Sequence, residues 1–198
     1  MNPQGLKSLS LLLALCCLCL FIAGINANSE PVQWPVNGHW YDAIDYPSTW
    51  IRAYIHAKRQ SHEGLPGHLA TLTSQEENDF VWQTFQRELY WLGGFQVRWA
   101  RRVDRGWRWI TGERWWRFTN WDDTQPDDGG DMVENGEENF LQFRYHESNG
   151  KWNDIWTTSQ QPGYMIEYEE MPDQALAPIK LKDIHQLTTT WAILKQAH

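Results

Sequence analysis

Residues 125–154 read QPDDGGDMVENGEENFLQFRYHESNGKWND, and this stretch is the most informative part of the chain. Between residues 122 and 138 there are eight carboxylates and no lysine or arginine: Asp122, Asp123, Asp127, Asp128, Asp131, Glu134, Glu137 and Glu138. Like charges at this density repel one another unless solvent or a bound cation relieves the repulsion. The glycines among them indicate a loop.

The donor atoms in this stretch suit calcium. A calcium ion takes roughly six to eight oxygens from carboxylates, side-chain amides and backbone carbonyls, and the segment offers all three kinds. It holds no cysteine and no adjacent histidine pair, which disfavours zinc. The charge run alone favours a solvated acidic turn, whereas the residues around it favour a metal site.

The first residues, 1–27, have the pattern of a secretory signal peptide. Lys7 precedes an apolar run from Leu11 to Ile25, and a small residue follows at the expected cleavage point. The run is short for a membrane span, which needs about 20 residues, although an uncleaved anchor or a lipidated cysteine stays open. All three cysteines lie in this leader (Cys16, Cys17 and Cys19), so the mature chain would form no disulfide.

The rest of the chain fits one domain. We expect a linker over residues 28–37, a folded domain over 38–169, and a tail over 170–198 that contains a short amphipathic helix from Leu187 to Ala197. The net charge is −8, and it becomes about −9 once the leader and its single lysine are removed. Such a chain is not a general binder of nucleic acid or anionic membranes.

The domain pattern predicts two helices followed by short strands, hence an α+β fold. A strand is expected over residues 38–44, and Ser48 or Thr49 should cap a helix from Trp50 to about Arg59. After a break at residues 64–67 we expect a short strand or an extended turn over 68–72. Ser74 and Glu77 form a capping box for a second helix that reaches about Arg87. Its apolar positions are Phe80, Val81, Thr84 and Phe85.

Seven arginines alternate with tryptophans between residues 98 and 117. Arginine over aromatic faces can bind anionic glycans or single-stranded nucleic acid. The simpler interpretation is a strand whose arginines face solvent. Fourteen tryptophans in the whole chain indicate a dense aromatic core, which offsets the absence of crosslinks.

The ordered motifs together resemble the C-type lectin-like domain, over roughly Gly38 to Glu169. They are Trp50, Gly67-His68-Leu69-Ala70-Thr71, Ser74-Gln75-Glu76-Glu77-Asn78, Trp91-Leu92-Gly93, Thr119-Asn120-Trp121, Gln125-Pro126-Asp127, Glu138-Asn139 and Trp152-Asn153-Asp154. The resemblance implies a double-loop α+β fold with two helices, short antiparallel sheets and a long loop region for calcium and sugar. It also implies a cis peptide before Pro126.

By position, the resemblance assigns calcium and sugar binding to Gln125, Asp127, Glu138, Asn153 and Asp154. The Gln-Pro-Asp order is similar to that of galactose-type members, as is the long glycine-containing loop after it. Those members carry a stacking aromatic in the loop, which this chain lacks. Gln96 and Asn139 replace acids of an auxiliary calcium site, so a second ion is doubtful. Ala57 with Ile166, and Phe140 with Thr157, stand where the family has disulfides.

We therefore expect a secreted, calcium-dependent carbohydrate-binding protein that leans to galactose-type sugars. The alternative is a lectin-like domain that binds a protein or a surface without sugar, because one fold hosts many ligands. An enzyme is disfavoured, since the histidines are scattered without nucleophile-base spacing. The expected partner is a glycan, without nucleic acid and without stable membrane insertion after signal cleavage. The sequence does not specify the natural glycan or the oligomeric state.

Overall fold

The computed structural model describes residues 30–171, apart from 98–101, 130–137, 145–148 and 157. The described elements are β1 (Val32–Gln33), β2 (Trp40–Ile44), α2 (Trp50–Ala57), β3 (Ser61–His62), β4 (Leu65–Leu69), α3 (Gln75–Phe85), β5 (Trp91–Gln96), β6 (Trp107–Trp109), the 3-10 helix η1 (Trp115–Arg117), β7 (Glu138–Phe143), β8 (Trp152–Trp156) and β9 (Tyr164–Tyr168). The predicted leader and tail helix lie outside these residues. Within them, no helix has the length and apolar character needed to cross a membrane.

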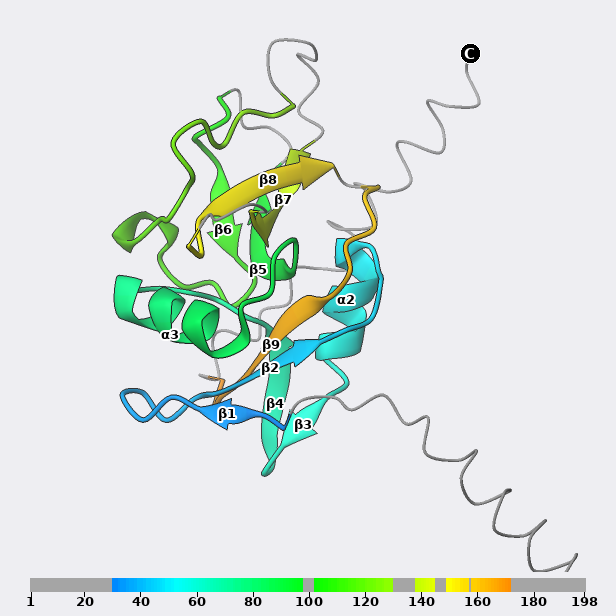
Figure 1. The fold of residues 1–198 in the computed structure, drawn as a ribbon, viewed down its shortest axis with the longest axis vertical. Helices are drawn as coiled ribbons and strands as arrows, with labels where there is room; N and C mark the ends of the chain where they lie inside the picture. The colour runs from blue at the N-terminus through cyan, green and yellow to red at the C-terminus, as the bar shows by residue number, and fades with distance from the viewer. Residues whose placement is uncertain (1–29, 98–101, 130–137, 145–148, 157, 172–198) are drawn as a thin grey trace, which may run out of the picture.

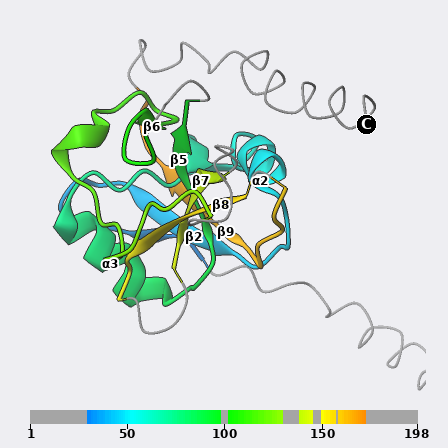
Figure 2. The same ribbon diagram turned by 90° about the horizontal axis from the view of Figure 1, so that it is seen from above.

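The last strand, β9, organises the sheet. It runs antiparallel to both β2 and β4, and the strand order is β1-β2-β9-β5-β7-β8. Figures 1 and 2 show α2 and α3 on opposite sides of the β2 and β9 strands. β6 pairs with β5, and the segment from β6 to β7 carries the 125–129 loop. The predicted α+β class with two helices and a long loop region is confirmed.

Helix α2 follows the prediction at its start and on its buried face. It begins at Trp50 and buries Trp50, Ala53, Tyr54 and Ala57. It ends at Ala57, two residues before the predicted end. Thr49 occupies the N-cap position, but its side chain makes no capping hydrogen bond.

Helix α3 confirms half of the predicted capping box. The Ser74 hydroxyl accepts a hydrogen bond from the Glu77 N–H at 3.1 Å. The Glu77 carboxylate, however, binds the N–H and the hydroxyl of Thr73, at 2.5 and 3.1 Å, one residue before the cap. The helix ends at Phe85. Thr84 is exposed, contrary to prediction, and the buried residues of the helix are Glu77, Asn78 and Val81.

The strand or extended turn predicted at 68–72 begins earlier in the structure, because β4 runs over Leu65–Leu69. The first helix has already ended at Ala57, before the break predicted at residues 64–67. Gly67 lies inside the strand and pairs with Tyr168 of β9. A Cβ at this position would lie 2.9 Å from the carbonyl oxygen of Ala57 and 3.2 Å from that of Gln60. The glycine therefore permits the strand to pass close to the end of α2.

Buried tryptophans dominate the core, and four of them donate their indole N–H at 2.8 Å. Trp50 donates to the Leu92 carbonyl, Trp91 to the Ser48 carbonyl, Trp107 to the Val103 carbonyl, and Trp152 to the Asn78 side-chain oxygen. Ala57 and Ile166, one of the two pairs at disulfide positions of the resembled family, are fully buried in one cluster. The other pair includes Thr157, which lies outside the described residues.

Candidate functional site

The site is positioned by Trp152, the first residue of β8, whose side chain is fully buried. Its backbone N–H donates to the Asn120 carbonyl at 2.8 Å, and its carbonyl accepts from the Asp122 N–H at 3.1 Å. These bonds fix the start of β8 against the segment that leads into Gln125. Asn153 and Asp154 are the next two residues of β8 and therefore lie beside this segment. Their side chains point to opposite faces of the strand.

The Asp154 carboxylate holds the 125–129 loop through backbone amides. It accepts from the Asp127 N–H at 3.1 Å and from the Asp128 N–H at 2.9 Å. The loop also ties itself together, because Asp127 accepts from Gly129 N–H at 3.1 Å and Asp128 from Glu138 N–H at 3.0 Å. The acidic side chains thus hold fixed positions in a hydrogen-bonded loop.

Three predicted carboxylates meet in this loop. Oxygens of Asp127, Glu138 and Asp154 all lie within 4.8 Å of one another. Glu138 is only 5% exposed and Asp154 only 1%. Among the described residues, no ion pair to a lysine, arginine or histidine offsets the charge of these three groups.

Burial and mutual repulsion raise the pKa values of two carboxyl groups in the cluster. Burial, reinforced by the charges of Asp154 and Asp127, raises the pKa of Glu138 to about 8. Burial also raises the pKa of Asp154 to about 6, although hydrogen bonds from Asp128 and Asp127 oppose the shift. Without a cation, the cluster therefore retains protons that ordinary carboxylic acids lose well below neutral pH.

The two predicted amide residues are neighbours of the cluster in the chain: Gln125 lies two residues before Asp127, and Asn153 directly precedes Asp154. The Gln125–Pro126 peptide bond is cis, as expected. The Gln125 side-chain oxygen is buried and has no hydrogen-bond partner in the described part of the chain. A buried polar oxygen without a partner is unfavourable, and a cation would supply one. Asn153 is half-buried and donates its amide to the Asp154 carbonyl.

Gln96 occupies the position where the auxiliary calcium site of the resembled family has an acid. Its side-chain amide donates to the carbonyls of Arg102, Val103 and Arg105, at 3.2, 3.0 and 2.8 Å. The glutamine therefore closes a turn.

In the neighbouring strand β6, Arg108 is exposed between two buried tryptophans, as the solvent-facing interpretation of the arginine-tryptophan segment predicts.

The family model for the lectin C-type domain matches residues 54–165, more than half of the chain and the whole segment that builds the acidic loop. The chain belongs to the C-type lectin domain family. The match contains the 125–129 loop, β7 with Glu138 and the Trp152-Asn153-Asp154 motif of β8, which together form the carboxylate cluster.

Individual C-type lectin relatives resemble the chain over different lengths. Perlucin of Haliotis laevigata is 33% identical over 54% of this chain, and asialoglycoprotein receptor 2 of Rattus norvegicus is 27% identical over 77%. The matched part spans 65% and 44% of these two proteins. The crystal structure of the C-type lectin CEL-I from Cucumaria echinata is 25% identical, covers 72% of this chain and 99% of its own, and has a TM-score of 0.56.

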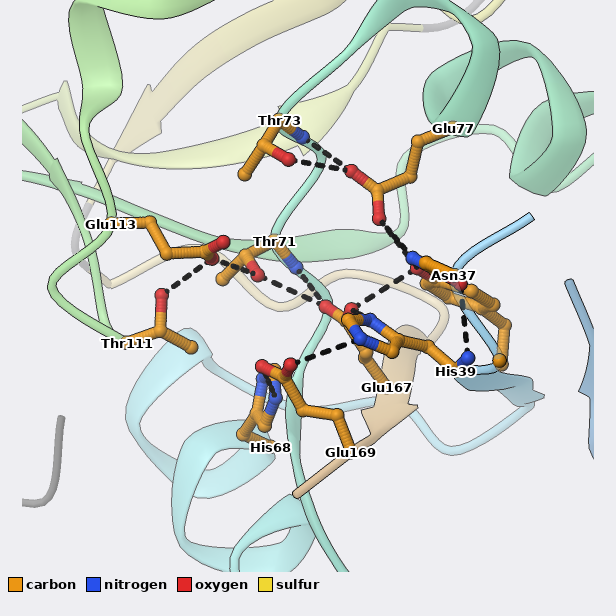
Figure 3. Close-up of polar contacts among 12 residues, drawn as sticks. Asn37, His39, His68, Thr71, Thr73, Glu77, Thr111, Glu113, Glu167 and Glu169 are labelled. Carbon is orange, nitrogen blue, oxygen red and sulfur yellow. Dashed lines mark hydrogen bonds and ion pairs between the residues drawn. The ribbon is translucent and has the colours of Figure 1, made fainter. Parts of the chain in front are cut away.

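A second charged cluster, which the sequence did not predict, lies where β2, β4 and β9 meet α3 (Figure 3). At its centre, Glu167 accepts from the Thr71 N–H at 2.9 Å and lies 2.7 Å from Nδ1 of His39. Glu169 joins the two imidazoles, at 3.2 Å from His39 Nε2 and 3.1 Å from His68 Nε2. The histidines are far apart in sequence, but the strand register brings them together.

Both histidines of the cluster around Glu167 lie where the protonated, positively charged imidazole is favoured. The His68 Nδ1 atom lies 2.9 Å from the Leu69 carbonyl, an acceptor, so this nitrogen donates. Burial would lower the pKa of His39 and of His68, but the Glu167 and Glu169 carboxylates outweigh it and raise both. Burial and the charge of Glu167 raise the pKa of Glu77 to about 7.

These shifts predict a pH-dependent stability of the lectin fold. The histidine pKa values are raised on folding, so their stabilisation is complete below about pH 6.5 and is lost as pH rises through the folded values. Each proton contributes a slope of up to about 1.4 kcal/mol per pH unit. We expect urea unfolding in chelator to show a falling free energy above about pH 6.5, and a shallower fall in His39→Gln. Parallel profiles for the two proteins would contradict this assignment.

Proposed function

We propose that this C-type lectin domain binds carbohydrate through one calcium ion held by Gln125, Asp127, Glu138, Asn153 and Asp154. The single observation that carries the proposal is the buried carboxylate cluster, whose three members lie within 4.8 Å and lack an ion pair among the described residues. The buried Gln125 side-chain oxygen, two residues before Asp127, has no hydrogen-bond partner among the described residues and adds a fourth candidate ligand atom. All these donors are oxygens, the ligand type that calcium prefers.

The chain's own residues suit the recognition of two neighbouring hydroxyls. A carboxylate accepts a hydrogen bond from each hydroxyl, and a side-chain amide donates one to the hydroxyl oxygen. Asp127 and Glu138 serve as the acceptors, while Gln125 and Asn153 serve as the donors. Calcium, when bound, supplies direct coordination of the remaining hydroxyl lone pairs. No covalent bond is made or broken, which is consistent with a binding protein.

We propose galactose-type sugars as the ligand class and secretion as the destination. The Gln-Pro-Asp order supports the first, and so does the relation to a protein named asialoglycoprotein receptor 2. The leader over residues 1–27 supports the second, and the folded domain is proposed to extend over 38–169 between the linker and the tail. A domain without cysteine needs no oxidising compartment to form crosslinks.

A glycan array tests the proposal. The purified mature chain, labelled and applied in calcium and again in chelator, should bind galactose-terminated glycans only in calcium. Binding of no glycan under either condition would contradict the carbohydrate function and favour a protein or surface ligand. Equal binding in chelator would contradict the role of the ion.

The sugar preference should follow the order of acceptor and donor on the two sides of Pro126. In the double variant Gln125→Glu/Asp127→Asn the carboxylate moves to the other side, with the same net charge and the same proline. We expect preference to shift from galactose toward mannose by about tenfold, the effect of roughly one hydrogen bond to a charged group. Competition with methyl galactoside and methyl mannoside measures it, and an unchanged ratio would refute this assignment.

A further inference from the structure

The structure contains an aromatic side chain beside the carboxylate cluster that the loop sequence does not reveal. Trp156 is the last residue of β8, two positions after Asp154. Residues two apart on a strand point to the same face, so Trp156 faces the 125–129 loop as Asp154 does. In the β7–β8 ladder, Trp156 is the partner of Glu138. It is partly exposed, unlike the core tryptophans.

Gly129 shows how close the indole comes to the cluster. A Cβ placed on Gly129 would lie 3.0 Å from Cζ2 and 3.5 Å from Cη2 of Trp156, and 3.8 Å from Cδ of Glu138. The benzene ring of the indole and the Glu138 carboxyl group therefore border the same glycine. Gly129 also has a positive φ of 85°. The glycine brings no side chain between the ring and the carboxyl group.

A carboxylate beside an aromatic ring can contact a hexose in two ways: the carboxylate accepts hydrogen bonds from hydroxyls, and the ring packs against an apolar face of the sugar. A sugar held by its hydroxyls at Glu138 brings its ring carbons within reach of whatever lies beside that carboxylate. Galactose has its axial 4-hydroxyl on one side, which leaves C3, C4 and C5 hydrogens as a continuous apolar patch on the other. Aromatic rings bind such apolar patches well, and tryptophan offers the largest ring.

We propose that Trp156 is a specificity-determining residue that packs against the apolar C–H face of a galactose-type sugar. It takes the place of an aromatic residue within the loop itself. This inference rests on the proposed carbohydrate function and names the contact that favours one class of sugar. A residue that only packed the loop would act on calcium and sugar binding together, whereas a sugar-contacting residue acts on the sugar alone.

The matched variants Trp156→Leu and Trp156→Phe separate these roles. Calorimetry would measure the calcium Kd without sugar, and then the methyl β-galactoside and methyl mannoside Kd values at saturating calcium. For Trp156→Leu we expect the galactoside Kd to rise about tenfold, the upper range for one aromatic contact. The mannoside Kd should change less, the calcium Kd should stay within about twofold, and Trp156→Phe should retain most galactoside affinity.

A spectroscopic measurement on the unsubstituted chain keeps the inference testable if a variant folds poorly. In protein labelled with 5-fluorotryptophan, the Trp156 signal is the one that Trp156→Phe lacks, and it should shift on addition of galactoside in calcium. An unmoved signal, or equal losses of calcium and sugar affinity in Trp156→Leu, would overturn the role of Trp156 while leaving the proposed function intact. A wild-type chain that binds no sugar in calcium would overturn the proposed function itself.

Discussion

In the Asp154→Asn variant we expect calcium affinity to fall by more than about 100-fold, and calcium-dependent glycan binding to disappear with it. Outer-shell substitutions near a metal typically cost about 10–100-fold, and this change removes a charge from the proposed ligand set itself. It also affects the loop, because both Asp154 oxygens accept backbone N–H groups, from Asp127 and Asp128. An asparagine keeps only one accepting oxygen, so one of these amides loses its partner.

Asp123→Asn is the matched control for this result. It removes the same charge two residues before Gln125, but Asp123 is exposed and is not part of the carboxylate cluster. Calcium titration by calorimetry should give nearly wild-type affinity for Asp123→Asn and no measurable binding for Asp154→Asn. If both variants bound calcium as the wild type does, the proposed metal site would be wrong. If both lost it equally, net charge of the loop rather than coordination would be responsible.

The sequence predicted the carboxylate cluster because its parts lie in short, recognisable motifs. Asp127 follows directly on Pro126, and Asp154 lies two residues after the buried Trp152 that anchors β8. A residue's partner in the next strand is harder to predict. The β-bulge between Glu138 and Phe140 shifts the register of β7 against β8, and that shift sets Glu138 opposite Trp156. Nothing in the local sequence pattern specifies such a bulge, so the sequence does not predict that Trp156 lies beside the carboxylate cluster.

The cluster around Glu167 escaped prediction for a related reason. His39 immediately precedes β2, His68 lies in β4 and Glu167 lies in β9, and only the antiparallel pairing of β9 with β2 and β4 brings them together. A signal was present in the final strand, where Glu167 and Glu169 alternate with Ile166 and Tyr168, although strand alternation alone does not distinguish buried from exposed acids. The helix ends were also predicted only to within a few residues: α2 ends at Ala57 and α3 at Phe85, each two residues before the predicted end.

Calcium should stabilise the fold strongly, since binding to the native state alone adds RT ln(1 + [L]/Kd) to the free energy of unfolding. At a hundredfold excess over Kd this is about 2.7 kcal/mol, a large share of the stability of a single domain. In the calcium-free fold, Glu138 and Asp154 can ionise together only against their mutual repulsion in a buried place, and they gain a common partner when the ion binds. We expect thermal unfolding in calcium to occur several degrees higher than in chelator, by about 4 °C or more.

The size of this stabilisation should depend on pH in a direction that the pKa values determine. Glu138 and Asp154 have folded pKa values of about 8 and about 6, above their ordinary values of 4.5 and 3.8. In chelator, groups with raised folded pKa values contribute stability that is full below the ordinary values and is lost as pH rises through the folded ones. Calcium, in contrast, must displace those protons, so its affinity rises over the same interval, by up to about tenfold per pH unit for each proton displaced.

The melting curves with and without calcium should therefore separate as pH rises from about 5.5 to about 8.5. Calorimetric titration in two buffers of different ionisation enthalpy would count the released protons directly, with a value near one at neutral pH for Glu138. The Asp154→Asn variant provides the control, because its melting temperature should not respond to calcium at any pH. A wild-type melting temperature that ignores chelator, or a calcium affinity that stays constant between about pH 6 and about pH 8, would contradict the assignment of these carboxylates to the ion.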